Sequence, residues 1–297
     1  MTKPLCLQAF DINFNMYKTA QEEFDLKKFL IRESPVYDRT EIYRSKRMVL
    51  FQGDVRNSNT FDREFADLIV TSPPYNVGIE YNSNDDELTY EQYLEFSGNW
   101  IANCFKWSKP QARFLLNIPL DKNKGGQKSV GADLTKIAQK IGWKYHSTII
   151  WNEGNISRRT AWGSWLSAAA PYVIAPVELI VILFKENWKK TNGTKISDIT
   201  KEQFMEWTNG LWTFNGESKK KIGHPTPFPR DLPFRAIKLF SFVKDIVFDP
   251  FAGSGTTLIE AVNNNRIAIG LEIDPKYCEL AKKRIIKETT RLEFDNE

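Results

Sequence analysis

The chain has 297 residues and a mass of 34.4 kDa, with 41% hydrophobic, 26% charged and 13% aromatic residues. These proportions are typical of a globular protein and exclude a disordered, collagen-like or membrane-spanning chain. The formal net charge of +4 permits a polyanionic partner without requiring one.

The three cysteines, Cys6, Cys104 and Cys278, are too few and too far apart for a disulfide framework or a CxxC metal site. The first residues lack a basic stretch followed by an apolar run, and no apolar segment approaches the ~20 residues that span a bilayer. With only His146 and His224 in the chain, His-rich metal sites and Ser-His-Asp sites are disfavoured. We therefore expect a cytoplasmic protein without a membrane anchor or a metal.

The first half of the chain indicates alternating helices and strands. We interpret residues 1–47, which mix charged and apolar side chains, as a helical lead-in. MVLFQGD and ADLIVTSPPY are short apolar runs closed by turn residues, a pattern typical of buried strands in a parallel sheet. The segment TYEQYLEFSGNWIANCFKWSKP predicts a helix that ends at Pro110 and whose shared face holds Tyr90, Leu94, Trp100, Ile101 and Phe105.

The alternation continues to the end of the chain. RFLLNI, YHSTIIW and ELIVILFK predict three more strands, with DLTKIAQKIGW as a helix before the second of them. LPFRAIKLFSFV, TTLIEAVNNN and PKYCELAKKRIIKE predict helices, and DIVFDP and RIAIGLEID predict strands between them. This order predicts an α/β domain with a mostly parallel sheet.

Three regions interrupt the alternation. Residues 121–131 form a Gly- and Lys-rich loop, and residues 152–175 are rich in Gly, Arg, Trp and Ala. Residues 186–222 hold seven Lys and five Asp or Glu, together with three tryptophans, without a long apolar run. We interpret the third region as an insertion on the sheet and not part of it.

A glycine-rich loop, DPFAGSGTT (residues 249–257), follows a strand and opens a helix, the place where an α/β sheet holds a nucleotide-like ligand. Gly253 and Gly255 allow a tight turn and a close approach of the backbone to the ligand. The loop lacks the third glycine of the dinucleotide fingerprint and the Gly-Lys-Ser/Thr end of a phosphate loop, so it suits a ligand without a pyrophosphate. The next strand ends at Glu272, whose carboxylate can accept both ribose hydroxyl protons. A helix-capping turn with a surface acid is the alternative.

A proline-rich loop, TSPPY (residues 71–75), closes another strand in a stiff conformation, because proline cannot continue the strand. Ser72 Oγ and the Pro73 carbonyl can then act as two fixed acceptors beside the ring of Tyr75, which suits an exocyclic amine. A simple strand-ending turn is the alternative. Two such loops on one rim indicate a methyl donor facing a nucleobase, so we expect Ser72 and Gly253 to lie face to face.

TSPPY and DPFAGSGTT resemble the catalytic and cofactor motifs of the amino-methylating DNA methyltransferases, and their order is similar to that of the permuted β class. FQGD, HPTPFPRDLPFRAIKLFS and AIGLEIDPKYCELAKKRI resemble flanking motifs, so the likeness extends over residues 48–287. It implies the fold of S-adenosylmethionine-dependent methyltransferases, α/β with a doubly wound, mostly parallel sheet and a variable DNA-recognition insertion. The implied division is a lead-in (1–47), a catalytic half (48–185), a target-recognition region (186–222) and a cofactor-binding half (223–297).

The resemblance also implies the roles of individual residues. The catalytic residues would be Ser72, Pro73, Pro74 and Tyr75. The cofactor, S-adenosyl-L-methionine, would be bound by Asp54, Thr71, Pro229, Asp249, Pro250, Phe251, Ala252, Gly253, Ser254, Gly255, Thr256, Glu272 and Ile273. DNA phosphates would be contacted by Lys189, Lys190, Lys219, Lys220 and Lys221, and phosphates or guanine edges by Arg158 and Arg159. Each of these runs can equally be a solvated surface.

Serine at the first position of the proline motif accompanies cytosine N4 in the resembling enzymes, whereas Asp or Asn accompanies adenine N6. The implied reaction is site-specific methylation of the N4 amine of a cytosine that is rotated out of double-stranded DNA, with Tyr75 as the stacking platform. With a neutral Ser72 we expect no strong base in place and release of the proton to water.

Several alternatives remain open. Asn76 is also common in adenine enzymes, which keeps an adenine-N6 methyltransferase as the nearest alternative. A glutamine or RNA methyltransferase and an inactive DNA-binding module are further ones. The usual setting of such enzymes is restriction-modification, so the resemblance leaves room for a companion restriction endonuclease and for a homodimer.

Overall fold

The computed structural model of the chain describes residues 38–76, 88–121, 128–154, 163–171, 177–191, 193–217 and 228–294. The chain divides into two units, Met1–Ser34 and Pro35–Glu297, and all of the described residues belong to the second. The expected helical lead-in therefore lies outside the described residues up to residue 37.

The described residues contain a nine-stranded sheet with the order β1-β2-β9-β8-β3-β4-β6-β5-β7. The strands are β1 (Arg39–Arg44), β2 (Met48–Gly53), β3 (Ala66–Thr71), β4 (Ser108–Pro119), β5 (Lys144–Asn152), β6 (Val177–Phe184), β7 (Leu211–Thr213), β8 (Ile246–Asp249) and β9 (Ile267–Glu272). Only β1 and β6 run against the strands beside them. The predicted mostly parallel sheet is confirmed.

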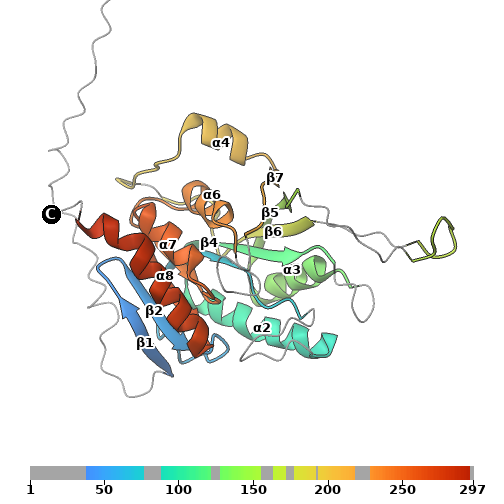
Figure 1. The fold of residues 1–297 in the computed structure, drawn as a ribbon, viewed down its shortest axis with the longest axis horizontal. Helices are drawn as coiled ribbons and strands as arrows, with labels where there is room; N and C mark the ends of the chain where they lie inside the picture. Colours follow the sequence, from blue (N-terminus) through green and yellow to red (C-terminus); the bar gives the residue numbers. More distant parts are fainter. Residues whose placement is uncertain are drawn as a thin grey trace, which may run out of the picture. The chain divides into compact units, whose positions relative to one another are not determined.

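Helices cover both faces of the sheet (Figure 1). They are α2 (Tyr90–Trp107), α3 (Val130–Ile141), α4 (Lys201–Trp207), α6 (Asp231–Phe240), α7 (Thr256–Asn263) and α8 (Pro275–Phe294). The crossovers β3-α2-β4 and β8-α7-β9 run in opposite directions along the sheet, so the right-handed rule places α2 and α7 on opposite faces. This is the doubly wound arrangement. Among the described helices, none is both long and apolar enough to traverse a membrane.

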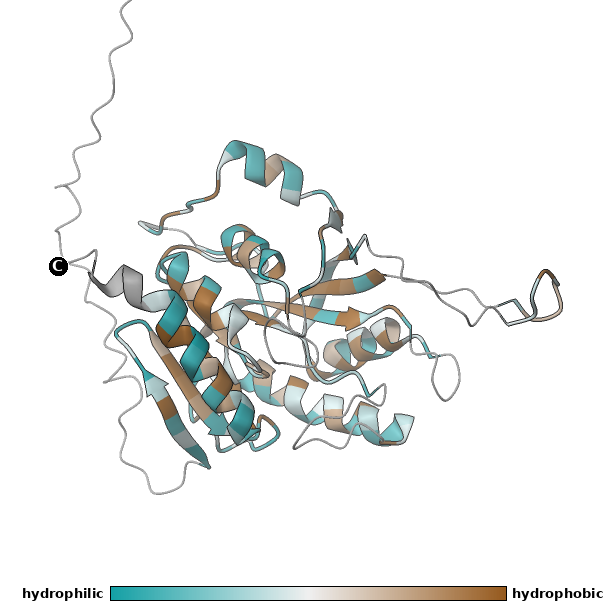
Figure 2. Ribbon diagram, viewed as in Figure 1, coloured by the Kyte–Doolittle hydropathy of each residue, from teal (hydrophilic) through white to brown (hydrophobic). Residues whose placement is uncertain are grey.

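The central strands are covered on both faces, which explains their continuous apolar sequences. All six residues of β3 are buried, as are the first four residues of β2. A strand that is buried on both sides needs apolar side chains at consecutive positions instead of alternating ones. In Figure 2 the central strands are mostly brown, the colour of hydrophobic residues, whereas the helices that cover them mix brown and teal residues.

Helix α2 forms where it was predicted, but its buried face differs from the predicted one. Thr89 caps its first turn by accepting from the Gln92 backbone N–H, and the helix ends at Trp107, three residues before Pro110. Its buried residues are Tyr93, Ser97, Trp100, Ile101, Asn103, Cys104 and Trp107. Trp100 and Ile101 match the prediction, whereas Tyr90, Leu94 and Phe105 are only half-buried. The buried positions 93, 97, 100, 104 and 107 follow one helical stripe, which is rotated about the helix axis from the predicted one.

The interpretation of residues up to 47 as helical is wrong for Arg39–Arg44, which form strand β1. This strand pairs antiparallel with β2, with Arg39 opposite Gly53 and Arg44 opposite Val49. Ile42 and Tyr43 pack against the core, as β-branched and aromatic side chains in strands commonly do.

The interpretation of residues 186–222 as an insertion outside the sheet is also wrong in part. Leu211–Thr213 form β7, which pairs parallel with β5 at one end of the sheet. Trp212 and Trp207 are buried in the core, and the guanidinium of Arg235 lies within 5.6 Å of both ring centroids. Two of the three tryptophans of this region therefore anchor it to the domain.

Candidate active site

The candidate active site lies at the sheet edge where β2, β9, β8, β3 and β4 end, here called the carboxyl rim. From the neighbouring strands β8 and β3 the chain leaves in opposite directions, toward β9 and β4. Doubly wound sheets bind ligands in the crevice that such a divergence opens. The pocket found there is lined by Gly53, Asp54, Val55, Arg56, Ser72, Pro73, Pro74, Tyr75, Phe96, Phe228, Asp249, Pro250, Phe251, Ala252, Gly253, Ser254, Thr256, Thr257, Glu272, Ile273, Asp274 and Tyr277.

The glycine loop between β8 and α7 forms one wall of the pocket. Gly253 and Gly255 have φ angles of 51° and 80°, in the left-handed region that favours glycine. A Cβ on Gly255 would also lie 3.3 Å from the Cβ of Ala281 on α8. Both glycines are therefore required by the backbone, and the turn leaves the Gly253 N–H free to donate to Glu272.

Glu272, the last residue of β9, lines the same side of the pocket with a carboxylate that is held in a fixed position. Its Oε2 accepts from the Gly253 N–H at 2.8 Å and its Oε1 from the Asp274 N–H at 2.9 Å. Burial raises the pKa of the carboxyl to about 7, although the two backbone bonds act to lower it. Each oxygen keeps a lone pair for the hydroxyl groups of a ligand.

Asp249, the last residue of β8, joins the two loops. Its Oδ1 accepts from Thr71 Oγ1 at 2.7 Å and from the Phe251 N–H at 3.1 Å. Burial raises the pKa of this carboxyl to about 6, against the lowering effect of the hydrogen bonds it accepts. Thr71 is buried and does not line the pocket. Its role is to tie the end of β3 to the end of β8.

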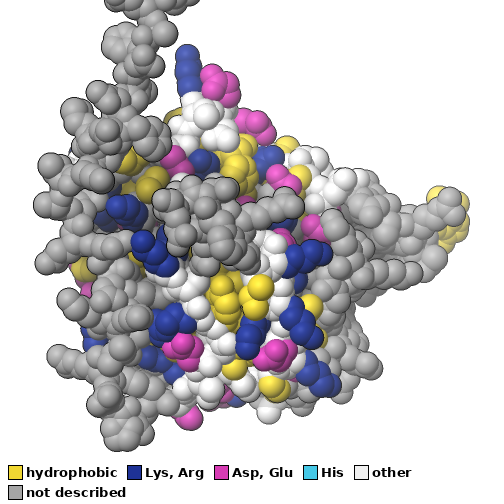
Figure 3. Space-filling model, turned by 60° about the vertical axis from the view of Figure 1, so that its left-hand side comes forward, with side chains coloured by type: hydrophobic (Ala, Val, Ile, Leu, Met, Phe, Trp, Pro, Cys, Tyr) yellow, Lys and Arg dark blue, Asp and Glu magenta, His cyan; other side chains and the backbone are white. Residues whose placement is uncertain are grey.

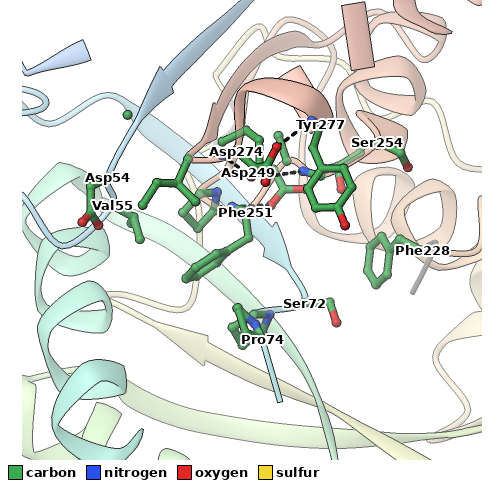
Figure 4. A pocket seen from close by; sticks show the side chains of 18 of the residues that line it. Asp54, Val55, Ser72, Pro74, Phe228, Asp249, Phe251, Ser254, Asp274 and Tyr277 are labelled. Atoms are coloured by element: carbon green, nitrogen blue, oxygen red, sulfur yellow. Dashed lines mark hydrogen bonds between the residues drawn. The ribbon is translucent and has the colours of Figure 1, made fainter. Parts of the chain in front are cut away.

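The proline loop after β3 forms the opposite wall. Figure 4 shows Ser72 and Pro74 across the pocket from Asp249, Phe251 and Ser254. Since Ser72 and Gly253 line the same pocket, the expected face-to-face arrangement of the two loops is confirmed.

Most of the residues predicted for the site are brought together here. All four predicted catalytic residues line the pocket, and so do ten of the predicted cofactor residues: Asp54, Asp249, Pro250, Phe251, Ala252, Gly253, Ser254, Thr256, Glu272 and Ile273. Thr71, Gly255 and Pro229 do not line it. Gly255 caps α7, and the neighbour of Pro229, Phe228, reaches the pocket instead.

Two polar residues behind Ser72 escaped the sequence reasoning. Tyr75 Oη lies 2.6 Å from Ser72 Oγ and donates to Glu178 Oε2 at 2.8 Å. Asn117 Nδ2 donates to Tyr75 Oη at 2.9 Å and also to Glu178. A carboxyl group therefore lies two hydrogen bonds from Ser72. The available signals were Asn117 within the run RFLLNI and Glu178 at the start of the run ELIVILFK.

Three aromatic residues that line the pocket were also not predicted from the sequence. Phe228, Phe96 and Tyr277 line the pocket from the segment before α6, from α2 and from α8. Tyr277 is held in place because Asp274 caps α8, its Oδ1 accepting from the backbone N–H groups of residues 276 and 277. Aromatic side chains occur throughout this sequence, so composition alone could not single these three out.

Arg158, Arg159, Lys219, Lys220 and Lys221 lie outside the described residues. Lys189 is exposed.

For Lys190 the prediction is wrong. Its side chain is 5% exposed, and its ammonium donates to the Asp67 carbonyl at 2.9 Å and to Asp245 at 3.1 Å. On the face drawn in Figure 3, the described Lys and Arg side chains are interspersed with Asp and Glu around a few hydrophobic side chains, so they form no single positive patch there.

Comparison with protein families and curated proteins gives concordant matches. The model of a family of N6/N4 methyltransferases, described as DNA methylase, matches residues 66–283. The chain is 64% identical to the type II methyltransferase M.MjaVI of Methanocaldococcus jannaschii over 159 residues, which are 54% of this chain and 81% of that protein. It is 29% identical to the type II methyltransferase M.HpaI of Haemophilus parainfluenzae over 245 residues, 79% of this chain and 72% of that one.

Solved structures give matching folds. A putative DNA modification methylase of Thermus thermophilus, solved in complex with S-adenosyl-L-methionine, aligns with a TM-score of 0.64 and 29% identity, covering 82% of this chain and 93% of that one. The cytosine-N4-specific PvuII DNA methyltransferase aligns with a TM-score of 0.63 over 86% of this chain and 96% of that one. At 20% identity, the second similarity concerns the fold alone.

Proposed function

Because the chain belongs to the DNA methylase family whose model covers residues 66–283, and uses S-adenosyl-L-methionine as its cofactor, we propose that it methylates the N4 amine of cytosine in double-stranded DNA. The observation that carries the proposal is that Ser72 of the proline loop and Gly253 of the glycine loop line one pocket. The type II relatives lead us to include a restriction-modification system, with a companion endonuclease, in the proposal.

The residues of the glycine-loop wall suit the cofactor. Glu272 has a free lone pair on each oxygen for the two ribose hydroxyls, and the turn at Gly253 lets the backbone approach the ligand. Phe251, Phe228 and Tyr277 offer apolar surface that suits an adenine ring. When bound, the cofactor supplies an electrophilic methyl group on its sulfonium.

The proline-loop wall suits the target amine. The lone pair of the cytosine amino nitrogen is delocalised into the ring, which makes the nitrogen a poor nucleophile. Hydrogen bonds from the amine to Ser72 Oγ and to the Pro73 carbonyl favour a pyramidal nitrogen whose lone pair points across the pocket. Because the amine is paired inside duplex DNA, the base must rotate out, and the ring of Tyr75 offers it a stacking surface.

The choice of cytosine over adenine rests on Ser72. Asn76, which keeps the adenine alternative open, donates its amide to the Leu88 carbonyl at 2.8 Å and does not line the pocket. Asn76 therefore has a role in holding the loop, with a φ of 52°, and is not in itself a sign of an adenine substrate. For sequence recognition we propose residues 186–222 together with the loops at 121–131 and 152–165, of which Lys189 is the exposed, described candidate for a phosphate contact.

The proposal is tested by incubating the protein with labelled cofactor and duplex DNA and then digesting the DNA to nucleosides. We expect the label in N4-methylcytosine, and N6-methyladenine would overturn the choice of base. Ser72→Ala should lower kcat by about 100-fold or more while the cofactor Kd stays unchanged. Asp249→Ala should mainly weaken cofactor binding, and Ser58→Ala, at an exposed position, is the matched control. Identical phenotypes for Ser72→Ala and Asp249→Ala would contradict the division of roles.

A further inference from the structure

Four polar side chains form a continuous chain of hydrogen bonds that leads away from the pocket. It begins at Ser72, passes through Tyr75, and ends at Glu178 and Asn117 on strands β6 and β4. Strand β6 is antiparallel to β4, so its first residues, and not its last, reach the carboxyl rim: Glu178 lies opposite Pro119. The sheet topology therefore places the Glu178 carboxyl group behind the proline loop.

The directions of these hydrogen bonds follow from the number of protons available. Asn117 uses its amide N–H groups as donors to Tyr75 Oη and to Glu178. Tyr75 has one hydroxyl proton, which it donates to Glu178 Oε2 at 2.8 Å. The Tyr75 oxygen must then accept in its contact with Ser72, so the Ser72 hydroxyl donates to it. With the Glu178 carboxyl ionised, Ser72 therefore keeps only lone pairs for the pocket.

Protonation of Glu178 would reverse this order. A carboxylic acid can donate to Tyr75, which frees the tyrosine proton to point at Ser72 Oγ, and the serine hydroxyl can then donate into the pocket. An exocyclic amine brings two donor N–H groups, so it needs an acceptor there. A donating serine would face a donating amine, the wrong arrangement for activating the nitrogen.

We propose that Glu178 is a positioning residue for methyl transfer: acting through Tyr75, its carboxylate holds the Ser72 hydroxyl as a hydrogen-bond acceptor for the target amine. The inference rests on the proposed role of Ser72 and holds for an amine of either base. Asn117 supports the arrangement by fixing both Tyr75 and Glu178. Glu178 itself needs no contact with the base.

The surroundings of Glu178 shift the pKa of its carboxyl group into the pH range in which methyl transfer is measured. Burial raises the pKa of its carboxyl to about 7, while the hydrogen bonds from Tyr75 and Asn117 lower it and the negative charge of Glu153 raises it. Glu153 follows β5 on one side of β6, Tyr75 follows β3, and the β4 neighbour Asn117 is neutral. On α3, which also packs on β6, the acid Asp133 accepts from Tyr90 and is engaged there. Above about pH 7 the carboxylate form, and with it the accepting serine, should predominate.

The test is the pH dependence of kcat between pH 5.5 and 8.5. Cofactor and DNA are both saturating, so that the titration of Asp249 and Glu272 does not contribute through cofactor binding. For the wild-type protein we expect kcat to fall toward tenfold per pH unit below about pH 7. Glu178→Gln, which keeps the size but is always neutral, should lose this dependence and show a kcat at pH 8 at least tenfold lower. Its cofactor Kd should stay within twofold of the wild-type value.

Two further variants make the experiment decisive. Tyr75→Phe removes the linking hydroxyl and should also give a flat, low profile. Glu153→Gln removes the nearby negative charge and should move the inflection to lower pH. The proposal is overturned if Glu178→Gln keeps the wild-type profile, or, should that variant fail to fold, if Tyr75→Phe keeps it. The labelled nucleoside from the same reactions reports separately on the base: N6-methyladenine would overturn the choice of cytosine and leave the role of Glu178 standing.

Discussion

The adjacent residues Lys189 and Lys190 offer a test of how burial separates structural from DNA-binding lysines. Lys190→Met removes a buried ammonium and keeps most of the volume of the side chain. The side chains of Lys190 and its partner Asp245 are 5% and 2% exposed. Breaking a buried ion pair from one side destabilises a protein by about 3–5 kcal/mol. Asp245 keeps two donors, Lys195 at 2.8 Å and the Phe242 N–H at 3.0 Å, so the lower end, about 3 kcal/mol, is expected.

In a domain of this size, a loss of about 3 kcal/mol should lower Tm by about 6–12 °C. Burial acts to raise the pKa of Asp245, but the charge of Lys190 and the bond from Lys195 hold it below the ordinary value of 3.8. A depressed carboxyl pKa contributes stability that is present above the unfolded-state pKa and lost as the pH falls through the folded-state value. The destabilisation by Lys190→Met should therefore be full at pH 7 and shrink below about pH 4.

The assay is urea unfolding of the two variants Lys190→Met and Lys189→Met, together with DNA affinity measured over a range of salt concentrations. Lys189→Met should change the free energy of unfolding by less than about 0.5 kcal/mol, because the side chain is exposed. If Lys189 contacts a phosphate, its loss should reduce the slope of log K against log salt by about 1. A Lys190→Met protein of wild-type stability with a reduced salt slope would refute the reasoning.

Three further predictions concern Glu272 in the pocket and two residues of the core. The affinity of the wild-type protein for S-adenosyl-L-methionine, measured by calorimetry, should rise with pH up to about 7. Burial raises the pKa of Glu272 to about 7, and the ionised form accepts the ribose hydroxyls. Glu272→Gln should bind the cofactor more weakly and without this pH dependence. Gly270→Val should destabilise the protein by about 1–3 kcal/mol in urea unfolding, because a Cβ would lie 2.5 Å from Leu258 Cδ1, whereas Gly98→Ala, with its nearest neighbour at 3.8 Å, should be tolerated. Trp212→Ala should lose about 3–5 kcal/mol if the region before α6 is anchored in the core, and a loss below about 1 kcal/mol would contradict that anchoring.

The sequence predicted those elements whose signal is local. The strand at DLIV and the glycine turn at residues 249–257 each carry their own pattern, a continuous apolar run or a turn that only glycine adopts easily. Because parallel strands end on one rim, placing both loops after strands also predicted that Ser72 and Gly253 would meet.

The rest depends on contacts that no local pattern contains. Glu178 reaches the site only because β6 runs antiparallel, a direction that the apolar run ELIVILFK does not encode. The three-residue strand β7 has no run of its own and forms because β5 offers it an edge. Lys189 and Lys190 are chemically identical neighbours, and only the fold decides which ammonium meets Asp245.

The strand order also has a consequence for synthesis of the protein. The last two strands along the chain, β8 and β9, lie in the middle of the sheet, between β3 and β2. A ribosome therefore releases residues 48–71 long before residues 246–272 exist to pair with them. Until residues 246–272 have been synthesised, two apolar strands must wait with open hydrogen-bonding edges, the state in which nascent chains recruit chaperones or aggregate. Premature termination before residue 246 should consequently yield insoluble product and not a smaller folded protein.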